Sequence, residues 1–385
     1  MFSSLDFDVR PGNGLGMFDI GSSLWTVLET LRGLQHVFPQ VDIKYDPDVS
    51  TTSPIIVHIR PHLDLLFSGR MQRLHTICVR ELRDPNPPIT LRYKDTILSS
   101  KEEALQRLGV SRSFGPTYSG EDLRYPGISF SFNGDNMADT LKAAKMEDRT
   151  QEVKKVTITQ RNDQEAIEEV RECRIMNGDI ARAVAKVHEG VTLHFYPSSS
   201  SPAQIRLNET TAQDLILALG PPSRVHYKED ERMMIHASSS NSTNSEAGYF
   251  HNYFQHGIDF FISSSSHIVK KILLHTNVVG SPLFQRYKRC CWEIEGAPED
   301  DEDGNVPYRW LVFMLDTPPR KRFYDRFETI SHFLSPNEPP PSMVLNRTDD
   351  DNLITLPNAA TRLYGYDGIV LEVSESSQVL AVMLV

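Results

Sequence analysis

The sequence predicts an α+β fold of four irregular repeats, each a helix plus an antiparallel meander, arranged as two pseudo-symmetric halves. Three observations lead to this prediction. A strand-turn-strand pattern with alternating apolar residues occurs four times, a short amphipathic segment precedes each occurrence, and a turn with a candidate strand lies between the two. One helix over three strands buries its apolar face poorly, so neighbouring units are expected to cover one another.

The clearest hairpin is GIDFFISSSSHIVKKILLHTN at residues 257–277. Ile258, Phe260 and Ile262 share one face, whereas Asp259 belongs to the opposite face, which is expected to meet solvent. The first strand recurs in HLDLLF (62–67), GISFSF (127–132) and GIVLEV (368–373), and the second in MQRLHT (71–76), VKKVTI (153–158) and LAVMLV (380–385). The third and fourth hairpins match over eighteen residues without a gap.

A helix is predicted before each hairpin from apolar residues spaced along one helical face. These residues are Leu24, Val27, Leu28 and Leu31; Leu105 and Leu108; Ala212, Leu215, Ile216 and Leu219; and Phe327, Ile330 and Leu334. Thr211 and Asp214 predict a capping box at the start of the third helix, and Gly220 is expected to end it. Gly109 is expected to end the second helix. The candidate strands that follow are VDIKY, PTY, RVHY and SMVL.

The chain of 385 residues is long enough for two halves. Residues 1–160 are expected to hold the first two units, and residues 207–385 the last two. Residues 161–206 are expected to connect the halves and to add one strand, GVTLHFYP; a further strand is expected in RYKRCCWEIE. The polar insertions 133–152, 237–248 and 298–305 are typical of surface loops.

Composition restricts the classes of function. The net charge is -11, with 40 Lys and Arg against 51 Asp and Glu, which argues against a nucleic-acid partner and against stable attachment to an anionic membrane. The four cysteines show no disulfide spacing and the N-terminus does not resemble a secretory leader. A cytoplasmic location is therefore expected. No apolar run approaches the roughly 18 residues of a membrane-spanning helix.

No motif for catalysis, metal binding or cofactor binding stands out. Phosphate-binding glycine loops and the G-x-S-x-G serine elbow are missing from the sequence. His58 and His62 lie in a strand, where a spacing of four does not bring side chains together. Cys290 and Cys291 are adjacent and point to opposite strand faces, so they are expected to be small buried apolar residues. We therefore predict no catalytic residue, no metal and no cofactor. A composite enzyme site formed only in three dimensions stays an alternative.

Basic residues supply the candidate sites for a partner or a lipid. These candidates are Lys154, Lys155, Lys270, Lys271, Arg320, Lys321 and Arg322. The favoured interpretation of the lysine pairs is structural, because charges at a strand entrance protect an exposed sheet edge. The fourth hairpin has Ala381 and Val382 in their place, so the fold does not require them.

Three blocks of the central region carry a family resemblance. LGPPSRVHYKEDERMMIH, YFHNYFQHGIDFFISSSSHIVKKILLHTN and FQRYKRCCWEI, preceded by YPGISFSF, resemble the phagophore assembly factor family of eukaryotic autophagy regulators. The resemblance extends from LDFDVRPGNGLG to the last hairpin. It implies a non-catalytic cytosolic adaptor that acts with a WD40-type β-propeller partner and is recruited to the phagophore assembly site.

The resemblance also implies that the propeller partner supplies most of the phosphoinositide recognition. Association of this chain with membrane would then be indirect. Two alternatives stay open: a module that binds phosphoinositides or other anionic lipids directly through the lysine pairs, and a factor in Golgi or endomembrane trafficking.

Overall fold

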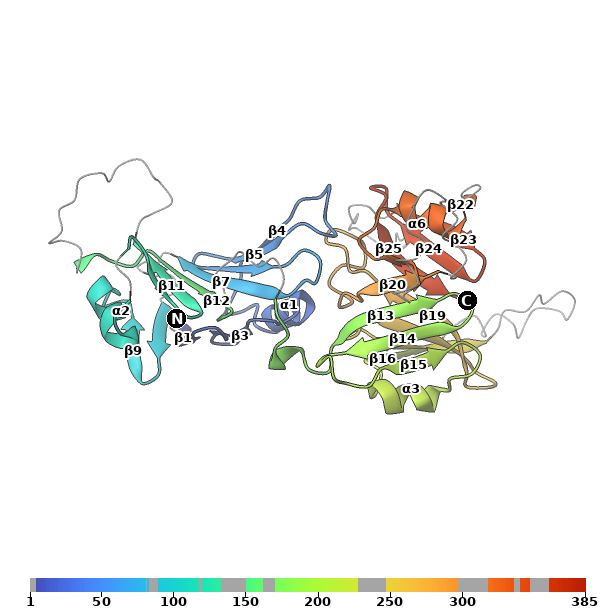
Figure 1. Cartoon of the computed structure of the whole chain (residues 1–385), viewed down its shortest axis with the longest axis horizontal. Helices are drawn as coiled ribbons and strands as arrows, with labels where there is room; N and C mark the ends of the chain where they lie inside the picture. Colours follow the sequence, from blue (N-terminus) through green and yellow to red (C-terminus); the bar gives the residue numbers. More distant parts are fainter. Residues whose placement is uncertain are drawn as a thin grey trace, which may run out of the picture. The chain divides into compact units, whose positions relative to one another are not determined.

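The computed structural model describes residues 5–80, 82, 89–117, 120–132, 150–161, 170–227, 247–296, 318–335, 340–346 and 360–385. The chain forms two compact units, Met1–Met176 (unit 1) and Asn177–Val385 (unit 2). Each described unit combines mostly antiparallel sheets with two α-helices, as Figure 1 shows. The predicted α+β class is thereby confirmed.

Unit 1 contains two sheets. The larger has seven antiparallel strands in the order β10-β11-β12-β7-β6-β5-β4. Its strands are β4 (Val41–Lys44), β5 (Ile55–Ile59), β6 (Leu63–Phe67), β7 (Leu74–Arg80), β10 (Leu123–Tyr125), β11 (Ile128–Ser131) and β12 (Lys155–Thr159). The smaller has the order β3-β2-β1-β8-β9, in which β1 and β8 run parallel. Its strands are β1 (Leu5–Arg10), β2 (Gly14–Leu15), β3 (Phe18–Asp19), β8 (Ile89–Tyr93) and β9 (Thr96–Ser99).

Unit 2 also contains two sheets. The larger has eight antiparallel strands in the order β16-β17-β18-β19-β25-β24-β23-β22. Its strands are β16 (Arg224–Tyr227), β17 (Gly248–Tyr253), β18 (Ile258–Ser263), β19 (Val269–His275), β22 (Ser342–Asn346), β23 (Ala360–Tyr366), β24 (Ile369–Val373) and β25 (Val379–Leu384). The smaller has the order β15-β14-β13-β20-β21, with β13 and β20 parallel. Its strands are β13 (Ile180–Lys186), β14 (Gly190–Phe195), β15 (Ala203–Arg206), β20 (Trp292–Glu295) and β21 (Arg320–Arg322).

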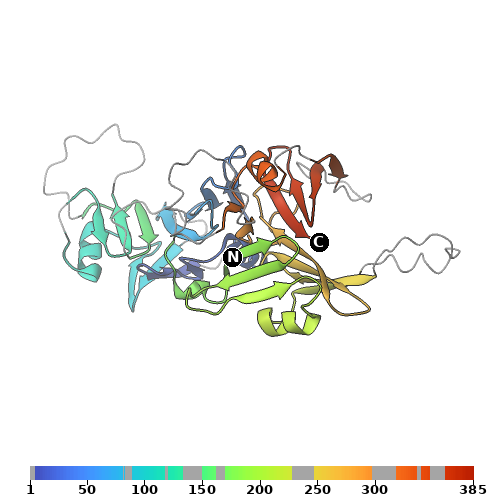
Figure 2. The ribbon, with the colours of Figure 1, turned by 45° about the vertical axis from the view of Figure 1, so that its right-hand side comes forward.

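Four α-helices and one short 3-10 helix are described. They are α1 (Leu24–Gly33), α2 (Arg107–Phe114), α3 (Ala212–Leu219), α6 (Phe327–Leu334) and the 3-10 helix η2 (Arg174–Met176). In unit 2, α3 and α6 lie at the two ends of the eight-stranded sheet (Figure 2). Tyr253 of β17 donates a hydrogen bond to the Gly220 carbonyl after α3, and Tyr366 of β23 donates one to Ser331 of α6. Both helices are thus fixed to the sheet by tyrosines.

The second helix differs from its prediction. Helix α2 begins after Leu105 and passes through Gly109, which an isolated helix tolerates at a cost of about 1 kcal/mol. It ends before Gly115, whose φ of 90° lies in the region that glycine adopts most easily. The described part of the PTY segment, Pro116 and Thr117, is not a strand.

All four predicted hairpins are present as the antiparallel pairs β6/β7, β11/β12, β18/β19 and β24/β25. The expectation that their polar face meets solvent is wrong for three of them. Asp64 of β6 is 3% exposed, Asp259 of β18 is 4% exposed and Glu372 of β24 is 7% exposed. For Asp259 the cause is the segment before β20, from which Tyr287 donates a hydrogen bond to this carboxylate. Strand β18 is consequently buried on both faces.

The segment 161–206 is more than a connector. The division between the units falls inside it, after Met176, and it contributes three strands to unit 2 where one was expected. The expected strand is β14, and β13 and β15 flank it. Strand β13 does not stand out in the sequence because it is rich in alanine, which is depleted in strands. Its other neighbour in the sheet, β20, also lies far along the chain. The RYKRCCWEIE segment forms a strand only over Trp292–Glu295.

Candidate functional site

The seven predicted cations lie in three places. Lys155 begins β12 in unit 1 and Lys154 directly precedes it, and Lys270 and Lys271 are in β19 of unit 2. The cluster Arg320, Lys321 and Arg322 forms β21. The structure therefore does not bring the two lysine pairs together within one unit.

The lysine pairs lie on interior strands. Strand β12 is hydrogen-bonded to both β11 and β7, and β19 to both β18 and β25. Protection of a sheet edge is therefore the wrong explanation for these charges. Lys154 Nζ is 3.8 Å from a Glu152 carboxylate oxygen, and Lys270 Nζ donates to Asn208 Oδ1 over 3.1 Å. One lysine of each pair thus already has a polar partner.

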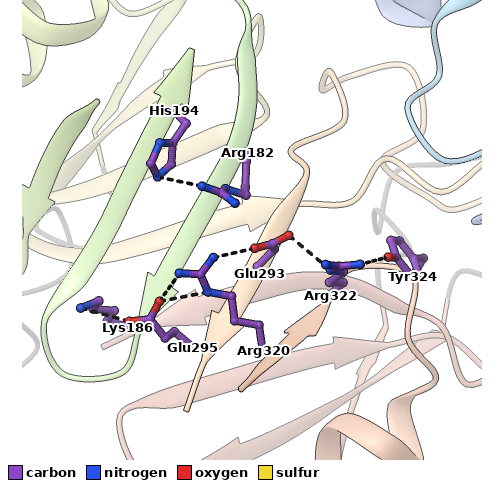
Figure 3. A network of polar contacts seen from close by, with 8 residues as sticks. All are labelled: Arg182, Lys186, His194, Glu293, Glu295, Arg320, Arg322 and Tyr324. Atoms are coloured by element: carbon purple, nitrogen blue, oxygen red, sulfur yellow. Dashed lines mark hydrogen bonds and ion pairs between the residues drawn. The ribbon is translucent and has the colours of Figure 1, made fainter. Parts of the chain in front are cut away.

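The third cluster belongs to an ion-pair network on the outer face of the small sheet in unit 2 (Figure 3). Arg320 donates from Nη2 and Nε to Glu295 Oε2, at 2.6 and 3.0 Å, and its Nη1 lies 3.4 Å from Glu293 Oε2. Arg322 Nε lies 3.3 Å from Glu293 Oε1, and its Nη1 donates to Tyr324 Oη over 2.7 Å. Two of the three predicted cations are therefore neutralised locally.

Lys321 does not join this network. It occupies the middle position of β21, so its side chain leaves the sheet on the other side from Arg320 and Arg322. Its Nζ lies 5.3 Å from the centre of the Phe333 ring of α6, within the range of a cation–π contact. The prediction grouped three residues that the strand divides between two faces.

Strands β13 and β14 extend the network beyond the predicted residues. Lys186 of β13 places Nζ 3.1 Å from Glu295 Oε1. Arg182, also on β13, places Nη2 3.5 Å from Nε2 of His194 on β14. Arginine has no acceptor atom, so His194 accepts through Nε2 and carries its ring proton on Nδ1. Figure 3 shows these side chains on one face of four adjacent strands.

Strand alternation explains this arrangement. Arg182 and Lys186 point outward, whereas Ala183 and Ala185 between them are fully buried. In the same way Glu293 and Glu295 alternate with Trp292 and Ile294, which are also fully buried. A bulge in the β13–β14 pairing, between Ile180 and Arg182, sets Arg182 directly opposite His194.

The charges of the network shift the pKa values of its members. Burial alone would raise the pKa of Glu295, but the hydrogen bonds and charges of Arg320 and Lys186 outweigh burial and hold it below its usual value. The pKa of His194 is lowered, first by burial and then by the charges of Arg182 and Arg320, against a smaller opposite effect of Glu293. His194 therefore lies in a positive local field.

The polar cluster around Asp259 does not form an open site. Asp259 accepts from His275 Nε2 over 3.0 Å and from Tyr287 Oη over 2.6 Å, and all three side chains are buried. The adjoining cavity of about 10 Å³ holds no more than a water molecule. Burial raises the pKa of the Cys290 thiol well above its usual value, the reverse of what a nucleophile needs.

The described segments hold no cluster of metal ligands and no helix that could cross a membrane. Within them, no three His, Cys, Asp or Glu side chains converge as metal ligands. None of the helices in these segments is long and apolar enough to cross a membrane. The outer face of the small sheet in unit 2 is therefore the strongest candidate site, and its chemistry is that of charge recognition.

Comparison with known proteins places the chain in a family. A model described as phagosome assembly factor 1 matches residues 14–385. The chain belongs to this family. A PHAF1 protein of Arabidopsis thaliana is 24% identical over 417 residues, covering 98% of this chain and 92% of the relative. PHAF1 proteins of Drosophila melanogaster and Caenorhabditis elegans are 24% and 26% identical, covering 99% and 98% of this chain and 94% and 93% of the relatives. No solved structure matches the chain.

Family membership confirms the resemblance that the central sequence blocks carry. The matched region extends over both units of the chain. The sequence did not identify Arg182, Lys186, His194, Glu293 or Glu295 as site residues. Their signal is the alternation of charged and apolar residues in RAVAK and WEIE, which indicates two polar faces but not that they share a sheet.

Proposed function

We propose that this chain is a non-catalytic adaptor of autophagy that acts with a WD40-type β-propeller protein at the phagophore assembly site. The observation that carries the proposal is membership of a family named for an assembly factor, over residues 14–385. An adaptor acts by binding other proteins through its surface. It is expected in the cytoplasm, with its contact to phosphoinositide-containing membrane made through the propeller.

The charged sheet face supports a role in protein recognition. Its side chains are anchored to one another by ion pairs, as Arg320 is to Glu295 and Lys186 is to the same carboxylate. Anchored charges lose little conformational entropy when a partner binds, which favours specific association.

Affinity purification tests the proposal. The tagged full-length chain is recovered from native extract under mild lysis, and bound proteins are identified by mass spectrometry against an unrelated tagged protein of similar net charge. We expect a WD40 propeller protein in near-equal amount to the chain. Recovery of the chain alone, as a clean monomer, would contradict the adaptor role.

Direct lipid binding is the alternative with less support. It needs Lys154, Lys155, Lys270 and Lys271 to act together, yet they are divided between the two units. Liposome flotation at low salt, where screening is weakest, separates the two functions. Flotation of the purified chain with anionic vesicles would favour direct binding, and flotation only in the presence of a propeller would favour the adaptor. If the chain acts in endomembrane trafficking instead, the chain and its propeller partner are expected on Golgi membranes.

We also propose that the four repeats and two pseudo-symmetric halves reflect internal duplication. In both units a hairpin-rich strand set, β1-β2-β3 or β13-β14-β15, pairs in parallel with a later strand, β8 or β20. Gly14 and Gly190 hold matching places: a Cβ on either would lie 2.2 or 2.1 Å from the carbonyl oxygen of Phe18 or Ile205. These correspondences support the proposal, and duplication would give the adaptor two related halves with different surfaces.

A further inference from the structure

Arg182 differs from the other cations of the network. Of the four cations drawn in Figure 3, Lys186, Arg320 and Arg322 each lie within 3.4 Å of Glu293 or Glu295. Arg182 has a hydrogen bond only to His194, and no carboxylate of the described residues pairs with it. The Arg182 guanidinium therefore has N–H donors left from which an anion could accept hydrogen bonds.

The unused donors of Arg182 are held in place. A guanidinium has five N–H donors in a fixed plane, and His194 accepts through only one of its nitrogens. The side chain is half-buried on β13, and the bulge beside Ile180 fixes its position along the strand. Val184, the next residue on the same face of β13, is 3% exposed. Arg182 thus lies beside a buried, closely packed position of the sheet.

The local charge favours an anion at this point. Four cations meet three carboxylates here: Arg320 engages both Glu293 and Glu295, and Glu189 Oε2 lies 3.9 Å from Lys186 Nζ. The charges of Arg182 and Arg320 also oppose protonation of His194. The negative charge of a bound carboxylate would offset this positive field. Arginine can donate two charge-assisted hydrogen bonds to a carboxylate, and such bonds are about twice as strong as neutral ones.

We propose that Arg182, positioned by His194, is the binding site for a carboxylate of an acidic protein segment that docks on the outer face of the small sheet in unit 2. The inference rests on the proposed adaptor role, which makes the partner a protein. The alternation of cations with Glu293 and Glu295 along the face matches a segment in which acidic residues alternate with basic or neutral ones.

A membrane surface fits this face less well than a peptide. An anionic membrane presents negative charge evenly, and it would meet Glu293 and Glu295 as well as the cations. The whole chain carries a net charge of -11, which opposes close approach to such a surface. A peptide can direct single carboxylates to Arg182 and leave the glutamates uncontacted.

Binding of two labelled peptides to the purified full-length chain tests this inference. The acidic probe, called oligo-glutamate below, is a ten-residue peptide in which glutamate alternates with glutamine, and the neutral probe is an oligo-glutamine of the same length. Binding is measured by fluorescence anisotropy at low ionic strength. We expect oligo-glutamate alone to bind. Arg182→Gln should weaken its affinity about tenfold, the loss of one charge-assisted hydrogen bond pair.

Arg206→Gln is the matched control. Arg206 lies on β15 of the same sheet, and its Nη1 is already 3.1 Å from Glu209 Oε2. Arg206→Gln therefore changes the net charge by the same amount but removes an arginine that is already paired with a carboxylate. We expect less than a twofold effect. Equal losses in both variants would show non-specific attraction, and failure of oligo-glutamate to bind the wild type would also overturn the inference.

Vesicles containing phosphatidylserine form the third arm. Binding of vesicles without binding of oligo-glutamate would assign the face to a membrane and overturn the inference. Thermal unfolding of both variants checks that they are folded. The peptide assay uses no propeller, so a failure there would not contradict the adaptor proposal, which could then involve another surface. Conversely, absence of a propeller protein from native extract would not change the peptide result.

Discussion

Two His–Asp pairs show how burial decides what a single residue contributes. Asp259 and His275 are paired over 3.0 Å with side chains 6% and 7% exposed. Asp367 and His188 are paired over 3.2 Å with side chains 97% and 59% exposed. The first carboxylate depends on its partners for hydrogen bonding, whereas water can replace the partner of the second.

Asp259→Asn is therefore expected to destabilise unit 2 strongly. The asparagine has nearly the same shape but leaves His275 and Tyr287 facing an uncharged amide, and losing buried hydrogen bonds to a carboxylate costs about 3 kcal/mol. Asp367→Asn is the matched control and should change the free energy of unfolding little. Urea denaturation followed by tryptophan fluorescence measures both. A similar small effect in both variants would show that the buried carboxylate is not a stabilising centre.

His256 makes stability depend on pH. Burial, followed by the charge of Lys288, lowers its pKa to about 4, against smaller opposite effects of Asp179 and the Leu219 backbone. In the unfolded chain the pKa of histidine is about 6.5, so the unfolded state takes up the proton first as the pH falls. The free energy of unfolding should then fall between about pH 6.5 and pH 4, by about 2 kcal/mol after allowance for partial exposure.

His256→Gln should remove this part of the acid sensitivity. Denaturation midpoints at pH 7 and pH 5 are compared for the variant, the wild type and His226→Gln, which changes an exposed histidine on β16. The variant should lose less stability on acidification than the other two proteins. Identical losses in all three proteins would mean that His256 titrates normally.

Residue patterns allowed prediction of the apolar core but not of these polar contacts. The alternation of Ile258, Phe260 and Ile262 predicts a buried face, and all three are fully buried. The same alternation predicts an exposed Asp259, which is wrong, because a period of two identifies two faces without saying what covers the second. The covering side chain, Tyr287, comes from a segment with no regular periodicity.

Local signals predicted helix α3 accurately because its boundaries are set by neighbouring residues. Thr211 Oγ1 accepts from the Asp214 backbone N–H over 3.2 Å, and the Thr211 N–H donates to Asp214 Oδ2 over 2.9 Å. This is the predicted capping box. The start of α2 has no such signal, since the side chain of its N-cap residue, Gln106, makes no capping hydrogen bond.

Thr211→Ala should lower stability by about 1 kcal/mol, the usual effect of losing an N-cap side chain. Gln106→Ala removes an N-cap side chain that caps nothing, so it should have almost no effect. Thermal unfolding monitored by circular dichroism compares the two. Equal effects would show that the hydrogen bonds at Thr211 are replaced by water without loss.

The pairing of distant strands limits prediction at the scale of elements. All four hairpins pair strands that follow one another in the chain, so the local alternation within each strand identifies them. The candidate site instead depends on the parallel pairing of β13 with β20, in which Ala183 lies beside Trp292. No local pattern specifies such a pairing, which explains why Arg320 and Arg322 were predicted without Arg182 and His194.

The two units of the chain have the same kinds of sheet but different surfaces. In unit 1 the small sheet carries Asp6, Asp8 and Arg92, with Arg92 Nε 2.7 Å from an Asp6 oxygen. In unit 2 the corresponding sheet has the surplus of cations around Arg182. Different charged side chains on two sheets of similar strand order would suit the proposed adaptor role, and the overall charge of -11 does not reveal this difference.

Affinity purification of the full-length chain from native extract tests the central claim most directly. The wild type and Arg206→Gln are expected to recover a WD40 propeller protein in near-equal amount to the chain, and Arg182→Gln is expected to recover about tenfold less. Equal recovery with all three proteins would place the contact away from Arg182. Recovery of the wild-type chain without any propeller protein would contradict the account of this protein as an adaptor.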